Sequence, residues 1–143
     1  MTNEQLHRID SMILSKDICV LATSDGFKPH ATLMYYFLDH AAMKFYFISL
    51  EGSQKIRNLA KCPHVSMVID QREEGLALTI EGVYSPIRRK QTAEAIIKLF
   101  VLRHPQFKDF AENPDTRLIR IEARTAQLVD IKGEKFTTKF KNS

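Results

Sequence analysis

The chain has 143 residues, of which 44% are hydrophobic and 27% are charged, and its formal net charge is +4. This composition is typical of a globular protein and excludes a disordered chain, and the length predicts one domain over residues 1–143. No apolar run approaches the roughly 20 residues of a membrane-spanning helix, and the first residues do not resemble a secretory signal. We therefore expect a cytoplasmic protein without membrane contact.

The first half of the chain predicts a helix followed by an antiparallel meander. Residues 3–14 carry apolar side chains at helical spacing after a capping Asn3. Three apolar runs rich in β-forming residues follow, at 17–24, 29–38 and 43–49. The turn dipeptide Asp25-Gly26 and the short segment 39–42 separate these runs, and such short connections favour consecutive antiparallel strands.

The second half alternates helices and strands. Ser53 is a good helix N-cap, and the helix it begins is expected to end before Pro63. Strands are predicted at 64–70, at 76–87 and at 117–131, the last being one long strand or two joined by a bulge. A helix at 93–103 precedes a loop with two prolines at 104–115, and a short final strand follows Gly133. Six or seven strands with three helices predict a mainly β protein with flanking helices (α+β), whose sheet closes into a barrel or forms a sandwich.

Two short stretches, residues 88–103 and 132–141, carry the excess positive charge. A nucleic-acid-binding protein usually combines such a stretch with stacking aromatic side chains or a recognisable module, and we identify neither. Solvated faces of a helix and of a C-terminal segment are the favoured interpretation. The alternative, nucleic-acid binding through Arg88, Arg89 and Lys90, predicts an affinity that falls steeply with salt.

The sequence does not indicate a metal centre or a catalytic pair of its own. No two of the five histidines have metal-ligand spacing, and the two cysteines, Cys19 and Cys62, do not form a zinc or disulfide pattern. Cys19 lies inside an apolar strand, where a thiol usually packs as a small hydrophobic group. We therefore predict no metal site.

The strongest local signal is the segment Glu51-Gly52-Ser53-Gln54-Lys55. The start of a helix exposes unpaired N–H groups and the positive end of the helix dipole, which together favour an anion. Cations normally avoid the first turn, so Lys55 is mildly unfavourable there unless a negative group is bound. An anion site and an ordinary capped helix with exposed cations are equally good explanations of these residues alone.

Residues 17–87 as a whole resemble the pyridoxamine 5'-phosphate oxidase-related, FMN-binding split-barrel family. The matching features, in order, are the segment LATSDGFKPHAT, a strand ending FYFIS, the segment GSxKxxNL, the segment CPHVSMV and a strand ending EGV. The resemblance implies a six-stranded antiparallel split barrel that forms a homodimer, with FMN bound at the subunit interface.

The resemblance also implies roles for individual residues. Ser53, Gln54 and Lys55 would hold the FMN phosphate, with Ser49 adding a hydroxyl, and Thr32 would lie near the phosphate and the ribityl chain. The backbone of Leu33, Met34 and Tyr35 would run along the isoalloxazine edge. Thr79, or a neighbour on its strand, would reach the flavin from the other subunit.

The chain departs from the vitamin B6 phosphate oxidases of this family. It has no tryptophan, Thr32 replaces an arginine, and the phosphate triplet is Ser-Gln-Lys in place of Ser-Arg-Lys. We therefore expect an FMN-dependent oxidoreductase with a different small-molecule substrate and NAD(P)H as a candidate electron donor. The alternative is a non-catalytic protein on the same barrel that binds flavin or haem for storage, sensing or transfer, with His64 or His104 as the candidate axial ligand of haem. The sequence leaves open whether FMN, a deazaflavin or haem fills the groove.

Overall fold

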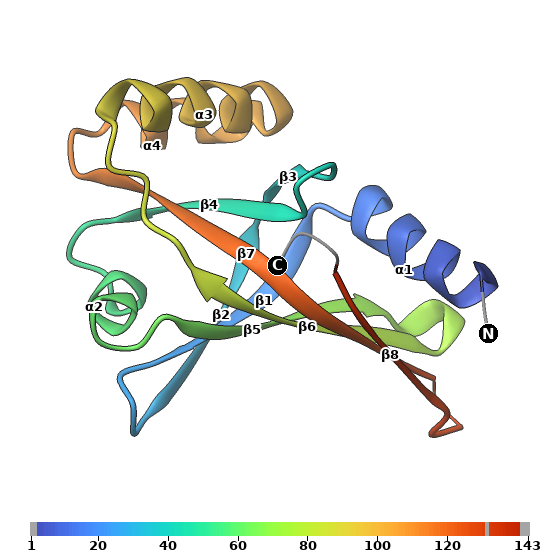
Figure 1. Cartoon of the computed structure of the whole chain (residues 1–143). Coiled ribbons are helices and arrows are strands. Elements are labelled where there is room, and N and C mark those ends of the chain that lie inside the picture. Colours follow the sequence, from blue (N-terminus) through green and yellow to red (C-terminus); the bar gives the residue numbers. More distant parts are fainter. Residues whose placement is uncertain (1–2, 131, 141–143) are drawn as a thin grey trace.

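The computed structural model describes residues 3–130 and 132–140, so residue 131 of the predicted strand 117–131 and residue 141 of the basic stretch 132–141 lie outside the described residues. The described residues form eight strands: β1 (Ile18–Ser24), β2 (Pro29–Tyr35), β3 (Phe37–Asp39), β4 (Lys44–Leu50), β5 (His64–Gln71), β6 (Leu76–Tyr84), β7 (Thr116–Asp130) and β8 (Lys135–Lys139). They make one antiparallel, strongly curled sheet in the order β2-β1-β5-β6-β7-β4-β3, with β8 paired to β7 (Figure 1).

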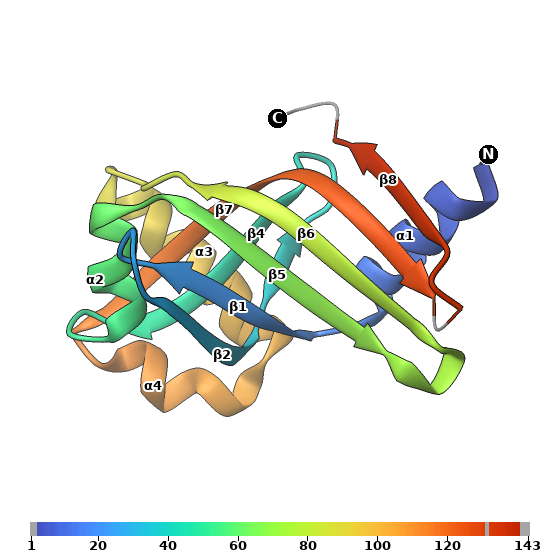
Figure 2. The same cartoon turned by 90° about the horizontal axis from the view of Figure 1, so that it is seen from below.

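Helices cover the ends and one outer face of this sheet. They are α1 (Asn3–Ser15), α2 (Gln54–Lys61), α3 (Lys90–Arg103) and α4 (Lys108–Glu112), with single 3-10 turns at Arg72–Glu74 and Pro105–Phe107. Helices α1 and α2 lie at opposite ends of the molecule, and α3 and α4 form a layer beside β4 and β7 (Figures 1 and 2). The mainly β architecture with flanking helices is confirmed.

Side-chain alternation along the strands builds the core. On β1, Cys19 and Leu21 are buried while Val20 between them is partly exposed, as expected for a strand with one interior face. β4 is different, because Phe45 to Ser49 are all buried. The interior of the curled sheet covers one side of β4 and the helical layer contacts the other.

The predicted strand 29–38 is divided in two at Tyr36. The Tyr36 amide donates to the Asp17 carbonyl at 2.9 Å, and its hydroxyl donates to the Ile13 carbonyl at 2.7 Å. These bonds hold Tyr36 between the end of α1 and the start of β1. The chain therefore leaves β1 as β2 ends and pairs with β4 as β3. This division explains why the described residues contain eight strands, one more than the seven segments predicted as strands and two more than the six-stranded barrel that the resemblance implies.

Three other element boundaries differ from the sequence prediction. The irregular loop predicted at 104–115 is wrong, because this segment contains a 3-10 turn and α4. The strand predicted to reach residue 87 ends at Tyr84, and the helix predicted from residue 93 begins at Lys90. β7 is one continuous strand in the described residues, and its register against β6 shifts between Glu81 and Gly82.

Candidate functional site

A cavity of about 450 Å³ lies where β2, the end of β4, the start of α2 and the helical layer meet. Its lining residues come from four places in the chain: Leu33, Met34 and Tyr35 on β2; Ile48, Ser49 and Leu50 on β4; Ser53 and Lys55 at the start of α2; and Phe100, Phe107 and Phe110 on the helical layer. Most of this lining is apolar, and the polar side chains gather at the α2 end. The cavity therefore suits a ligand with an apolar body and one anionic group.

Ser53 is the N-cap of α2, as predicted. Its Oγ accepts from the Ile56 amide at 3.3 Å and from the Ser49 hydroxyl at 2.9 Å. A serine oxygen has two lone pairs and one hydrogen, so these two bonds leave the Ser53 hydrogen to donate elsewhere. The amides of Gln54 and Lys55, in the first turn, have no acceptor within the helix. Ser53, these amides and Lys55 form what we call the anion corner.

Lys55 is the cation of the anion corner. Its side chain is partly buried in the cavity lining, and this burial lowers the pKa of its ammonium group. Removing water from a charged group is unfavourable unless an opposite charge replaces the water. The local surroundings of Lys55 therefore favour an anion-binding site over an ordinary capped helix with an exposed lysine.

Neighbouring polar residues on α2 do not line the cavity. The side-chain Nε2 of Gln54 donates to Asn58 Oδ1 at 2.8 Å, and Asn58 Nδ2 donates to Thr23 Oγ1 on β1 at 3.1 Å. Arg57 donates to Gln54 Oε1 at 2.7 Å and to the Gly52 carbonyl. The second cation of this turn is thus occupied by the protein's own oxygens.

The apolar end of the cavity is aromatic. Tyr35 packs edge-on against Phe107 and against His104, with ring centroids 5.2 Å and 5.1 Å apart. Sequence reasoning missed Phe107 and Phe110, because they belong to the segment predicted as a loop. Their i, i+3 spacing between two prolines was the available signal for a short helical turn with one aromatic face.

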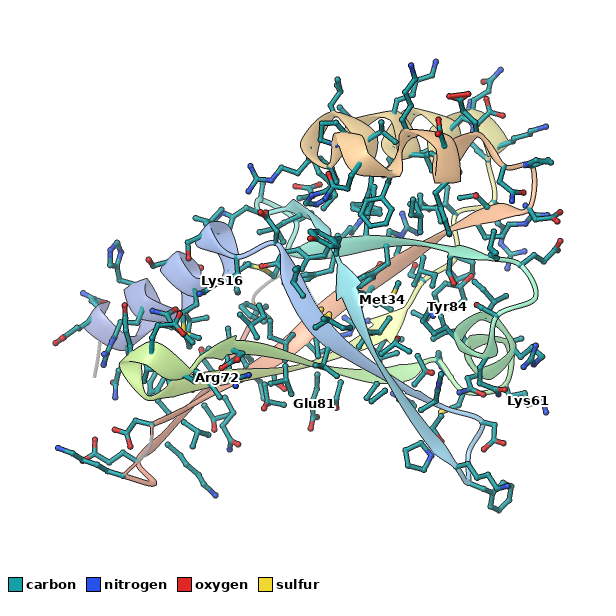
Figure 3. The ribbon with its side chains drawn as sticks, turned by 180° about the vertical axis from the view of Figure 1, so that it is seen from behind. Lys16, Met34, Lys61, Arg72, Glu81 and Tyr84 are labelled. Carbon is teal, nitrogen blue, oxygen red and sulfur yellow. The ribbon has the colours of Figure 1, made fainter. Side chains whose placement is uncertain are left out.

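Six of the nine predicted site residues line this cavity, namely Leu33, Met34, Tyr35, Ser49, Ser53 and Lys55. Met34 on β2 and Tyr84 on β6 both pack against the core, on the interior side of the sheet (Figure 3). The remaining three, Thr32, Gln54 and Thr79, do not belong to the lining.

Thr32 and Thr79 lie on opposite faces of the sheet. Thr32 pairs with Leu21 on the interior face, and its buried Oγ1 has no hydrogen-bond partner among residues 3–130 and 132–140. Thr79 belongs to a cross-strand row on the outer face, in which it pairs with Val68, Val68 with Val20, and Val20 with Leu33. We call this row the outer row.

The outer row lies along a second hollow, of about 780 Å³. Val20, Leu33, Tyr35 and Val68 contribute to its lining, and Lys16 and Arg72 lie at its edge. Both charged residues are at the end of the molecule opposite Lys61 of α2 (Figure 3). Leu33 and Tyr35 line both hollows, so the outer face of the sheet is continuous with the cavity.

Neither of the two histidines that were candidate haem ligands, His64 and His104, lines the cavity. His104 is buried with Nε2 2.7 Å from the Tyr36 carbonyl oxygen, a bond that holds the end of α3 against the β2–β3 junction. His64 is exposed at the start of β5. Cys19 packs in the core as a hydrophobic group, as predicted, and this burial raises the pKa of its thiol to about 12.

Two further features are absent from the described residues, 3–130 and 132–140. No cluster of three or more His, Cys, Asp or Glu side chains that could hold a metal ion occurs in them. None of their helices has the length and apolar character needed to cross a membrane.

Comparison with known proteins agrees with this architecture. The sequence matches the family model described as pyridoxamine 5'-phosphate oxidase over residues 6–130. A comparison with curated proteins found no match.

Solved structures with similar folds include two haem proteins. HutZ, the haem storage protein of Vibrio cholerae, has a TM-score of 0.68 and 18% identity, with 92% of each chain covered. A haem-binding protein of Mycobacterium smegmatis has a TM-score of 0.74 and 18% identity, with 90% of this chain and 55% of that chain covered. A Listeria innocua protein provisionally identified as a pyridoxamine 5'-phosphate oxidase has a TM-score of 0.70 and 22% identity, with 85% of this chain and 95% of that chain covered. At these identities the likeness establishes a shared fold.

Proposed function

Since the chain belongs to the pyridoxamine 5'-phosphate oxidase family, we propose that it binds FMN in the cavity between β2 and α2 and acts as an FMN-dependent oxidoreductase. The observation that carries this proposal is the position of the anion corner at one end of an aromatic cavity. FMN has the same division, with a phosphate at one end and a planar ring system at the other.

The residues present fit the phosphate of FMN. The Ser53 hydroxyl, the first-turn amides and the Lys55 ammonium supply hydrogen-bond donors and a positive charge in one place. Ser49 acts through Ser53, because its own hydroxyl already donates to Ser53 Oγ. The buried Oγ1 of Thr32 on β2 is a further polar group, without a hydrogen-bond partner among the described residues, and its contact with the phosphate or ribityl chain stays a prediction.

The aromatic end of the cavity suits the flavin ring. Leu33, Met34 and Tyr35 provide an edge, and Phe107 and Phe110 exclude water from one side. When bound, FMN would supply the hydride or electron transfer. The residues that line the cavity contribute no acid–base pair of their own. The protein's contribution is therefore to bind and orient the cofactor and to keep water from the ring. We propose a small-molecule substrate other than vitamin B6 phosphates, with NAD(P)H as a candidate donor.

We also propose a homodimer whose interface completes the flavin site. Leu33 is 71% exposed and Val68 is 37% exposed on the outer row, and Thr79 lies on the same face. Burying this row against a second copy would remove apolar surface from water and place Thr79 beside the cavity of its partner. Leu33 and Tyr35, which line both hollows, would then lie where the interface meets the flavin.

Absorption spectra test the cofactor. The purified chain is titrated with FMN, with riboflavin as the control that lacks the phosphate, and is then mixed anaerobically with NADPH or NADH. We expect a flavin spectrum, FMN binding tighter than riboflavin binding, and bleaching of the bound flavin. Failure to take up FMN would overturn the proposal. Bound flavin that no donor bleaches would favour storage or transfer, and a haem spectrum would favour the function that the names of two structural relatives carry.

A further inference from the structure

We propose that a chain of four side chains, Thr23–Asn58–Gln54–Arg57, positions the anion corner without touching the ligand. This inference rests on the proposed function and extends it to residues that do not line the cavity. The four residues come from β1 and from both the first and the second turn of α2. We call them the positioning chain.

The buried half of the positioning chain joins α2 to the sheet. Thr23 is 2% exposed and Asn58 is 1% exposed, and the Asn58 amide donates to Thr23 Oγ1 at 3.1 Å. Apolar residues would fill these interior positions without needing partners, so a paired polar contact here has a specific geometric effect. It fixes the rotation of α2 relative to β1.

The exposed half carries this constraint to the loop before the helix. Asn58 Oδ1 accepts from Gln54 Nε2 at 2.8 Å, Gln54 Oε1 accepts from Arg57 at 2.7 Å, and Arg57 also donates to the Gly52 carbonyl. The Ser53 amide, on the other side of the same peptide unit, donates to the Leu50 carbonyl at 2.9 Å. The peptide that leads into the helix is therefore held from both sides.

The anion corner needs this restraint because its own elements are weak. α2 has only eight residues, and helices of this length are unstable without external contacts. Its first turn contains no acidic residue to complement the helix dipole, and it contains Lys55. Donors bind a phosphate oxygen well only when they lie within about 0.5 Å of their ideal positions, roughly 2.7–3.2 Å from that oxygen. Fraying of this turn would therefore weaken phosphate binding specifically.

The test separates phosphate binding from binding of the ring. The Kd values of FMN and riboflavin are measured for wild type, Thr23→Val and Thr23→Ser. Valine has the shape of threonine and removes the acceptor, while serine keeps it. We expect Thr23→Val to weaken FMN binding about three- to tenfold with little change for riboflavin, and Thr23→Ser to retain wild-type FMN affinity.

Gln54→Leu provides a second variant at an exposed position, where the fold is not at risk. We expect the same selective loss of FMN affinity, and Ala60→Leu, at another exposed position of α2, serves as its matched control. Wild-type FMN affinity in Thr23→Val and Gln54→Leu would overturn the positioning role, as would an equal loss of riboflavin affinity. Absence of FMN binding by wild type would instead overturn the proposed function itself.

Discussion

Lys55 and Arg57 are cations of one helical turn with opposite surroundings. Lys55 lines the cavity and loses water, whereas Arg57 is exposed and donates to Gly52 and Gln54. The charge that reaches a ligand is therefore that of Lys55. A neutral residue at this position should weaken ligand binding without lowering the stability of the ligand-free protein. The burial that favours a bound anion makes the charged Lys55 side chain unfavourable when no anion is bound.

Lys55→Met should weaken FMN binding about 10- to 100-fold, the range of a charge-assisted hydrogen bond. Riboflavin binding should change little, and the melting temperature of the ligand-free protein should not fall, because the variant removes a partly buried charge. Calorimetric titration and thermal unfolding measure these quantities. Lys61→Met, at the exposed far end of α2, is the matched control. Equal losses for FMN and riboflavin would contradict the assignment of Lys55 to the phosphate.

The pH dependence follows from the lowered pKa of Lys55. Between this lowered value and the ordinary value of 10.5, the unfolded chain binds more protons at this residue than the folded chain does. The contribution of Lys55 to the free energy of unfolding of the ligand-free protein should therefore rise with pH across this alkaline window. FMN affinity should fall across the same window, because the ammonium loses its charge.

Two measurements check this prediction. Urea unfolding without ligand gives the stability at each pH, and FMN titration gives the affinity. Subtracting the profile of Lys55→Met removes the titration of the flavin and of other groups. If the alkaline loss of FMN affinity persists in Lys55→Met, another group is responsible.

Gly82 on strand β6 has no room for a side chain. At Gly82 the register against β7 shifts by one residue, and an added Cβ would lie 2.6 Å from Ile121 Cγ2 and 2.8 Å from the Glu122 carbonyl oxygen. Both distances are shorter than a carbon contact allows. The glycine therefore permits the backbones of β6 and β7 to approach at the bulge.

Gly82→Ala should lower the free energy of unfolding by about 1–3 kcal/mol, the usual cost of overpacking a well-packed interior. Urea unfolding measures the change. Gly52→Ala is the control, since a Cβ there would meet no described atom within 4 Å, and we expect a change below about 1 kcal/mol. A Gly82→Ala variant as stable as Gly52→Ala would show that β7 moves aside at little cost.

Periodicity in the sequence was sufficient for most elements but not for their interruptions. The apolar, β-forming run that becomes β1 and the N-cap Ser53 of α2 are local features, and they were predicted correctly. The break at Tyr36 depends on hydrogen bonds to Ile13 and Asp17, which are distant in sequence. The helical turn in 104–115 was obscured by two prolines.

The same distinction applies to the candidate site. Six lining residues were proposed from a resemblance between short motifs, whereas Phe107 and Phe110 reach the cavity only because α4 packs beside β7. The resemblance assigned Lys55 to the phosphate, but the hydrogen bonds that occupy Arg57 could not be predicted, because only the folded loop brings the Gly52 carbonyl to Arg57. Site residues could be predicted where they lie within one short motif, and could not be predicted where their position depends on packing between distant segments.

At the scale of the whole molecule, the cavity opens onto the face that carries the outer row. Leu33 is the most exposed residue of that row and also lines the cavity. A second copy covering this face would both bury apolar surface and close the flavin site, so dimerisation and FMN affinity should be linked.

Val68→Asp should therefore shift the protein toward monomer and weaken FMN binding in the same variant. The substitution places a carboxylate in the middle of the outer row, where a buried interface would leave it without a partner, and we expect at least a tenfold increase in the dimer dissociation constant. Analytical ultracentrifugation over a range of concentrations measures this constant, and FMN titration follows at concentrations above and below it. Leu102→Asp is the matched control, because Leu102 is an exposed apolar residue of α3 outside the outer row. Wild-type association by Val68→Asp would place any interface elsewhere, and dissociation with unchanged FMN affinity would mean that one subunit suffices to bind the cofactor.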